Sequence, residues 1–250
     1  MRNNLISIIT PSYNASKFIA KCIDSVIAQT YQKWEMIIVD DCSPDNSNAI
    51  IEKYMQKESR IRLIKLAKNS GAAVARNRAI QEAKGRYIAF LDSDDLWYQE
   101  KLEKQLRFMQ EHAIALSYTA YSSIDESTGE VIREIAIPSQ VDYTQLLKQN
   151  SIGCLTAMYD THILGKVMMP IIRKRQDFAL WLTILKEVPY AYGLDEVLAY
   201  YRVRGHSVSS NKIEASLYNW KLYREIEKLP LHKALYYFSW YTYKSILKYR

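Results

Sequence analysis

The chain has 250 residues, 48% of them hydrophobic and 24% charged, as expected for an ordinary globular protein. Its formal net charge is +7. No apolar run approaches the roughly 20 residues of a membrane span, and the first residues do not resemble a secretory signal peptide. The three cysteines lack a Cys-x-x-Cys spacing, so the sequence indicates neither a disulfide framework nor a zinc site, and we expect a cytoplasmic protein.

Strand and helix patterns alternate through the first hundred residues. Apolar β-branched runs predict the strands, and apolar residues at helical spacing predict the helices. Strands are predicted over 5–10, 34–39, 61–66 and 86–91, and helices over 18–27, 44–55 and 71–83. This alternation indicates βαβ units, in which helices cover both faces of a parallel sheet.

After residue 111 the predicted elements no longer alternate regularly. The patterns predict strands over 113–121 and 131–137 around a turn at 125–129, helices over 143–149 and 175–186, and strands near 189–192 and 197–203. From residue 213 onward they predict two helices broken at Pro230. We therefore expect an α/β protein with a Rossmann-like, mostly parallel central sheet flanked by helices, and a C-terminal helical extension.

Polar and acidic side chains follow several of the predicted strands. They occupy positions 10–14, 40–41, 69–71 and 92–95. In open α/β sheets, ligands bind beyond the carboxyl ends of the parallel strands. Because these positions converge on one edge of the sheet, we expect the functional site there.

The stretch FLDSDDLW places three carboxylates in four positions behind an apolar strand. Asp is a favoured N-cap residue, and we expect Asp95 to cap a helix that begins near Leu96. Capping does not explain all three, because like charges this close repel one another. Asp92 and Asp94 instead suit Mg²⁺ or Mn²⁺, held together with the oxygens of a diphosphate.

Two other polar positions have competing interpretations. Asp40 and Asp41 end the second strand, and either they cap a helix or one of them binds a nucleobase or a ribose hydroxyl; Asp45 is a ready cap for the helix that follows. Arg76 is either a solvated helix residue or a ligand clamp. The phosphate-binding loops GxxxxGK[ST] and GxGxxG are missing, which disfavours a nucleoside triphosphatase and a dinucleotide-binding fold.

Five stretches occur together in the order and at the spacing found in the family 2 glycosyltransferases. They are SIITPSYN, IIVDDCSPDNS, NSGAAVARNRAI, KGRYIAFLDSDDLW and RQDFALWLTIL. The chain resembles this family over roughly residues 5–210. The resemblance implies a GT-A fold and transfer of a sugar, with inversion, from a nucleotide-sugar donor to an acceptor hydroxyl. It also implies a catalytic domain at 1–211, with a nucleotide-sugar half (about 1–97) and an acceptor half (about 98–211), followed by basic, aromatic helices at 212–250.

The resemblance carries roles onto particular residues. The expected donor-binding residues are Pro11, Tyr13, Asp41, Arg76, Asp92 and Ser93. The family's DXD motif falls on Asp92-Ser93-Asp94, with Asp94 the expected direct metal ligand and Asp92 its neighbour.

The resemblance also places the catalytic base. The family carries the base in a Glu-Asp or Gln-Asp pair before a helix containing Leu-Trp, which implies Asp177, preceded here by Gln176. The alternative is that Asp177 only caps that helix. In the loop after the last core strand, His206 is a further candidate metal ligand, and Arg202 or Arg204 is expected to neutralise the leaving group.

We therefore expect an enzyme that builds bacterial capsular, teichuronic-type or lipopolysaccharide glycans. The donor is expected to be a uridine diphosphate sugar, from the frequency of uridine donors in the family, and the acceptor a glycan or a lipid-linked saccharide. Two alternatives remain: a nucleotidyltransferase that makes sugar nucleotides, which usually has a glycine-rich loop near its N-terminus, and a non-catalytic module that binds an anionic ligand. Nucleic acid is not an expected partner.

The C-terminal segment is strongly basic. Residues 212–250 contain eight Lys or Arg against three Glu, which is most of the chain's excess charge. The last twenty residues mix aromatic side chains with cations, as interfacial helices do at an anionic bilayer. We expect peripheral attachment to the cytoplasmic face of the bacterial inner membrane; the alternatives are a helix packed on the catalytic core and a homodimer contact.

Overall fold

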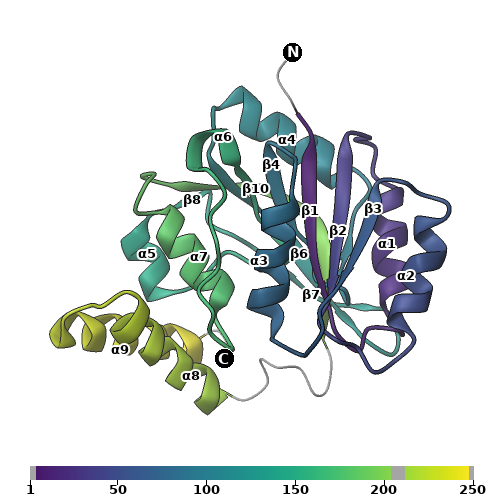
Figure 1. Cartoon of the computed structure of the whole chain (residues 1–250). Helices are drawn as coiled ribbons and strands as arrows, with labels where there is room; N and C mark the ends of the chain where they lie inside the picture. Colours follow the sequence, from purple (N-terminus) through teal and green to yellow (C-terminus); the bar gives the residue numbers. More distant parts are fainter. Residues whose placement is uncertain (1–3, 204–211, 248–250) are drawn as a thin grey trace.

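The computed structural model describes residues 4–203 and 212–247, in which a mixed ten-stranded sheet is covered by helices on both faces (Figure 1). The strands are β1 Ile6–Ser12, β2 Trp34–Asp40, β3 Ile61–Lys65, β4 Tyr87–Phe90, β5 Leu96–Trp97, β6 Leu116–Asp125, β7 Val131–Ile135, β8 Gln140–Val141, β9 Met158–Asp160 and β10 Ala191–Val203. The sheet order is β3-β2-β1-β4-β9-β6-β10-β5, with β7 paired to β6 and β8 paired to β10.

Parallel pairing is concentrated in two parts of the sheet. β3, β2, β1 and β4 pair in parallel, as the alternating pattern predicts, and so do β6 and β10. The short strand β9 pairs antiparallel with both β4 and β6, and so joins the two parts. The carboxyl ends of β4, β6 and β10 therefore lie near one another, which fixes where a site can form.

Helices cover both faces of the sheet. The described helices are α1 Ile19–Ile27, α2 Ser47–Met55, α3 Ala72–Glu82, α4 Lys101–Glu111, α5 Tyr143–Lys148, α6 Thr161–Leu164, α7 Gln176–Ile184, α8 Lys212–Lys221 and α9 Leu231–Leu247. A hydrophobic core on one face packs α1, α2 and α4 against the sheet, and a second core on the other face packs α3, α5 and α7. In α1 the buried residues are Ile19, Cys22, Ile23 and Val26, which is the spacing of one helix face.

Three predicted elements differ from the structure. The predicted strands near 189–192 and 197–203 are one strand, β10, because its register against β6 shifts between Leu194 and Val197 and again before Tyr200, which keeps the bulged segment in the sheet. No helix begins near Leu96: residues 96–97 form β5, which pairs with Tyr200 and Ala199, and helix α4 begins only at Lys101.

The predicted role of Asp95 as a helix cap is therefore wrong. Its carboxylate instead accepts the backbone N–H of Arg202 at 2.9 Å, which ties the loop after β4 to the end of β10. The prediction that Asp45 caps the next helix is closer to the structure, because its carboxylate accepts the N–H of Ser47, the first residue of α2, at 3.1 Å.

The C-terminal helices pack on the same core as α5 and α7 (Figure 1). Leu222, Tyr223 and Ala234 are buried in that core, and the Tyr223 hydroxyl donates to the carbonyl of Leu147 at 2.6 Å. The buried carboxylate of Glu227 accepts a hydrogen bond from Tyr143 and pairs with Lys186 at 2.7 Å. No described helix is both long and apolar enough to cross a bilayer.

Candidate active site

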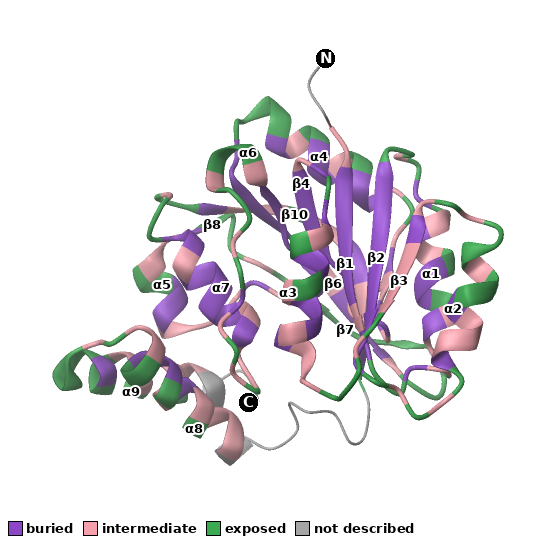
Figure 2. Cartoon of the chain, in the orientation of Figure 1, coloured by how far each residue is buried: buried purple, intermediate pink, exposed green. Residues whose placement is uncertain are grey.

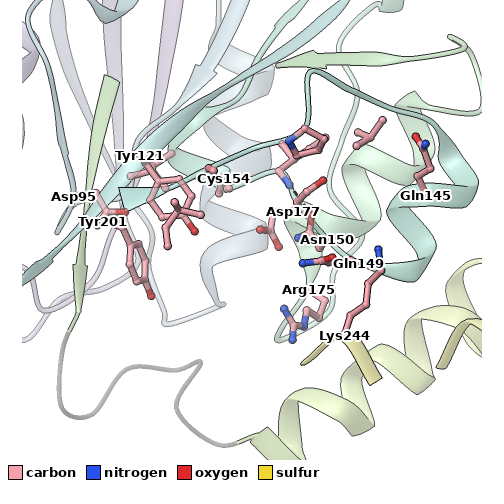
Figure 3. A pocket seen from close by; sticks show the side chains of 18 of the residues that line it. Asp95, Tyr121, Gln145, Gln149, Asn150, Cys154, Arg175, Asp177, Tyr201 and Lys244 are labelled. Carbon is pink, nitrogen blue, oxygen red and sulfur yellow. Dashed lines mark hydrogen bonds between the residues drawn. The ribbon is translucent and has the colours of Figure 1, made fainter. Parts of the chain in front are cut away.

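A cavity of about 650 Å³ opens at the carboxyl ends of β4, β6 and β10 (Figure 3). Its lining includes Asp92 and Asp95 after β4, Tyr121 of β6, Tyr201 of β10, Arg175 and Asp177 at the start of α7, Lys244 of α9, and the segment 149–155. Segments far apart in the sequence thus meet around one space. This is where the sheet architecture predicts a ligand site.

Two of the predicted site residues, Asp92 and Asp177, line this cavity together although 85 positions separate them in the sequence. Asp177 is the second residue of α7, and the beginning of that helix turns its carboxylate towards the space (Figure 3). The side chain of Asp92 is 29% exposed. The structure therefore places both carboxylates in the lining of one cavity that a substrate can enter.

Arg76 connects these two parts of the site. Its Nη2 donates to Asp92 Oδ1 at 2.5 Å, and its Nη1 lies 2.9 Å from Gln176 Oε1 when that amide is oriented to donate to Ile172 and Arg173. Burial alone would lower the pKa of Arg76, but the charge of Asp92 reverses this and the pKa is raised. Arg76 is thus a buried, permanently charged link, not a solvated helix residue.

Gln176 therefore has a defined partner in the structure. A Glu at this position would set a second carboxylate against Arg76, whereas the amide accepts one hydrogen bond from it without adding charge. Through Arg76, the residue that precedes Asp177 is connected to Asp92.

The loop that carries the three aspartates is held by Arg202. Its backbone N–H donates to Asp95, and its Nε donates to the carbonyl of Asp94 at 2.9 Å. Asp95 is buried, and its burial together with the charges of Asp94 and Asp92 raises its pKa well above the ordinary value. In the described structure Arg202 therefore organises this loop; its predicted contact with a leaving group stays a prediction.

The carboxylate oxygens of this loop are ligands that suit a hard divalent cation. Burial raises the pKa of the Cys22 thiol well above its ordinary value, and the negative charges of Asp95, Asp94 and Asp92 raise it further. The described residues contain no group of three or more His, Cys, Asp or Glu side chains able to hold a metal by themselves. Mg²⁺ does not require one, because it is commonly held by one or two carboxylates plus phosphate oxygens and water. His206 and Arg204 lie outside the described residues.

The other predicted donor-binding residues lie outside the cavity lining. Pro11 is near the end of β1, beside Val39 of β2, and Tyr13 is 53% exposed just beyond it. The buried carboxylate of Asp41 accepts the N–H groups of Ser70 and Gly71, each at 2.7 Å, and thereby shapes the loop before α3. Ser93 is buried within the aspartate loop. Their roles in donor binding stay predictions.

A buried network supports the floor of the cavity. Trp97 Nε1 donates to the carbonyl of Leu155 at 2.8 Å, and Gln105 Nε2 donates to the carbonyl of Thr156 at 2.9 Å. Lys101 is buried behind them, where it donates to Gln105 Oε1 and lies over the Trp97 ring; its burial lowers its pKa to about 7. These hydrogen bonds thus fix the carbonyl groups of the turn at 154–156.

Several cavity residues carry no sequence signal of their own. Tyr121 and Tyr201, Gln149 and Asn150 are ordinary strand and loop residues until the chain brings them together. Lys244 belongs to the basic C-terminal segment, and nothing in its sequence context indicates a place in the site, yet it lines the cavity. Arg175 directly precedes the Gln-Asp pair, so of these additional cavity residues it is the one that lies within a family motif.

Comparison with known proteins finds a matching family profile and relatives similar in sequence. The profile described as Glycosyl transferase family 2 matches residues 7–172. A Bacillus subtilis protein, provisionally named as the teichuronic acid biosynthesis glycosyltransferase TuaG, is 48% identical over 98% of this chain and 97% of its own length. An Escherichia coli protein, named UDP-Glc:alpha-D-GlcNAc-diphosphoundecaprenol beta-1,3-glucosyltransferase WfgD, is 38% identical over 94% of this chain and 92% of its own length.

The fold also has a solved counterpart. The crystal structure of S. aureus TarS 1–349 in complex with UDP matches with a TM-score of 0.68 and 26% sequence identity. The match covers 79% of this chain and 60% of that one. It confirms the expected GT-A-like α/β fold.

Proposed function

The chain belongs to glycosyl transferase family 2, and we propose that it moves a sugar, with inversion, from a uridine diphosphate sugar to a hydroxyl of a lipid-linked saccharide. The observation that carries the proposal is the shared cavity of Asp92 and Asp177. Family membership agrees with neither a nucleotidyltransferase nor a non-catalytic binding module. TuaG is named for teichuronic acid biosynthesis and WfgD for a diphosphoundecaprenol-linked acceptor, and these names support our proposal that this chain acts in bacterial surface polysaccharide synthesis.

In the proposed reaction, the acceptor oxygen attacks the anomeric carbon from the face opposite the leaving group. The bond from that carbon to the diphosphate oxygen breaks, and its electron pair leaves with the uridine diphosphate. Asp177 accepts the proton of the acceptor hydroxyl as the new bond forms. An oxocarbenium-like transition state is expected by analogy with glycoside hydrolysis.

Asp92 and Asp94 are the residues that would hold Mg²⁺ or Mn²⁺, which when bound supplies positive charge to the leaving diphosphate. Arg76 fixes Asp92 by the 2.5 Å ion pair, and Arg202 fixes the loop through Asp94 and Asp95. The remaining residues predicted on the donor side, Pro11, Tyr13 and Asp41, and the domain division at residue 211, belong to the same proposal.

A panel of donors tests this function. Purified protein is incubated with UDP-glucose, UDP-N-acetylglucosamine or GDP-mannose, a divalent cation and a saccharide linked to a lipid diphosphate, and both the extended glycan and the released nucleotide are measured. We expect transfer from a uridine donor and formation of a linkage of opposite anomeric configuration to the donor. Transfer from the guanosine donor alone would contradict the donor assignment, and a retained configuration would contradict inversion.

We further propose that α9 attaches the protein peripherally to the cytoplasmic face of the membrane. One face of α9 is packed, through Ala234, Tyr237 and Phe238. The opposite side is exposed (Figure 2), and its large apolar residues are Leu231, Leu235, Tyr236, Trp240 and Tyr243, between 37% and 56% exposed. Lys148 of α5 lies 5.5 Å from the Trp240 ring centroid, so a cation accompanies the aromatic groups. Aromatic side chains beside cations suit the surface of an anionic bilayer.

The helix packs on the core, which is one of the alternatives left open by its sequence, and it still exposes an aromatic face. Leu231 and Leu235 are exposed to solvent, whereas Tyr237 packs on the core.

Flotation with vesicles tests the membrane proposal. Full-length protein is expected to float with phosphatidylglycerol-containing vesicles at low salt, and a Trp240→Ala, Tyr243→Ala double variant is expected to lose most of this binding because it removes two exposed aromatic groups. Tyr190→Ala, which removes an aromatic side chain 37% exposed elsewhere, is the control. If the unaltered protein stays with the unbound fraction, or if the double variant only dissociates a dimer in size-exclusion chromatography, the exposed face is not a membrane surface.

A further inference from the structure

Two cations stand on one side of the cavity. Arg175 and Lys244 lie with Gln149 and Asn150 around Asp177, while Asp95 and the two tyrosines lie at the other end (Figure 3). The aspartate loop, where the donor diphosphate is proposed to sit, is also at that other end. Both lining cations therefore stand at one end of the cavity, close to Asp177, and the other two lining acids, Asp92 and Asp95, belong to the aspartate loop at the other end.

Helix α9 positions both cations. Arg175 Nη2 donates to the hydroxyl of Tyr241 at 2.7 Å, and the guanidinium lies 5.7 Å from the centroid of that ring. Tyr241 and Lys244 are three residues apart, so they lie on the same side of the helix. Arg175 adopts a left-handed backbone conformation, with φ of 67°, directly before α7. Arg175, directly before α7, and Lys244, on α9, thus form one cationic corner of the cavity.

The surroundings of this corner suit a sugar attached to an anion. Gln145, Gln149 and Asn150 line the adjoining wall and offer uncharged donors and acceptors of the kind that hydroxyl groups need. An Arg beside a Lys suits phosphate oxygens, because the guanidinium can bind two of them at once and the ammonium adds a point charge.

We propose that Arg175 and Lys244 bind the diphosphate of the acceptor, so that this enzyme takes a saccharide joined through diphosphate to a lipid. The inference rests on the proposed function and names its acceptor class. It places the two diphosphates at opposite ends of the cavity, with Asp177 and the reacting hydroxyl between them. The lipid would leave the cavity beside α9, whose residue next to Lys244 in the chain, Tyr243, belongs to the exposed aromatic face.

Paired acceptors test this assignment. Lys244→Gln and Arg175→Asn, the latter chosen because Asn tolerates a left-handed backbone, are assayed with one saccharide in two forms, as a lipid diphosphate and as a phosphate-free alkyl glycoside. Each variant is expected to lose roughly 10- to 100-fold in kcat/KM for the diphosphate form, because a charged hydrogen bond is lost, and to stay within about twofold for the other. Lys233→Gln, an exposed cation of α9 outside the cavity lining, is the control.

Direct binding makes the test independent of turnover. A short prenyl diphosphate without sugar is titrated into the protein by calorimetry, with UDP titrated separately. We expect both variants to weaken binding of the prenyl diphosphate and to leave UDP affinity unchanged. Weakened UDP binding would assign the corner to the donor instead, and absence of prenyl diphosphate binding to the unaltered protein would overturn the inference. Failure of the proposed function itself has a different signature: prenyl diphosphate binds, but no sugar is transferred to either acceptor.

Discussion

Replacing Asp177 by Asn is expected to lower kcat by about 10²- to 10⁴-fold while UDP still binds with unchanged affinity. This is the usual contribution of a positioned general base, and Asn keeps the size and shape of Asp without accepting the proton. Asp177 lines the cavity at the start of α7, apart from the aspartate loop, so its loss does not remove a donor contact. The rate of glycan extension at saturating substrates and calorimetry with UDP measure the two quantities.

A matched control for this variant lies ten residues further along the chain. Glu187 is exposed, follows the end of α7 and is not part of the cavity lining, so Glu187→Gln is expected to leave kcat unchanged. If Asp177→Asn kept its kcat but bound UDP more weakly, the residue would belong to donor binding and the base would have to be another group.

Removing the divalent cation is expected to have an effect of similar size. Asp94→Asn, or an excess of EDTA with the unaltered enzyme, should lower transfer by roughly 10³-fold, because a bound cation contributes several kcal/mol to stabilising the charge that grows on the leaving diphosphate. Asp94 gives a cleaner test than Asp92, whose replacement would also leave the buried Arg76 without its partner at 2.5 Å. Rates are measured across a titration of Mn²⁺ and of Mg²⁺.

The variant and the chelator must agree for the metal proposal to stand. Asp94→Asn should need more cation to reach half its maximal rate, whereas Asp24→Asn, at an exposed carboxylate on α1 that accepts a hydrogen bond from Tyr54, should behave as the unaltered enzyme does. Undiminished transfer in EDTA would show that the aspartate loop holds the donor without a metal.

Sequence patterns predicted the parallel half of the sheet well, because its strands are mostly apolar and polar residues follow their ends. The patterns failed where a strand is defined only by its pairing with strands distant in the sequence. Leu96 and Trp97 are too few to show a strand pattern, and only their pairing with β10 reveals β5. Strand β9 has three residues, yet it joins the two parallel parts of the sheet.

The candidate site, too, was predicted only in part. The motif residues Asp92 and Asp177 were predicted, and the structure brings them to one cavity. Their connection through Arg76 and Gln176 was not predictable, because it depends on where α3 and α7 lie against each other. The place of Lys244 in the cavity lining was not predictable either, because the sequence shows a basic, aromatic helix but not which of its sides faces the core.

The family profile ends at residue 172, and the cationic corner lies beyond it. So does Asp177, whereas the carboxylates after β4 lie within the profile. A change in the last 78 residues would therefore alter the proposed acceptor contacts and the proposed base together, and would leave the carboxylates proposed to hold the donor in place.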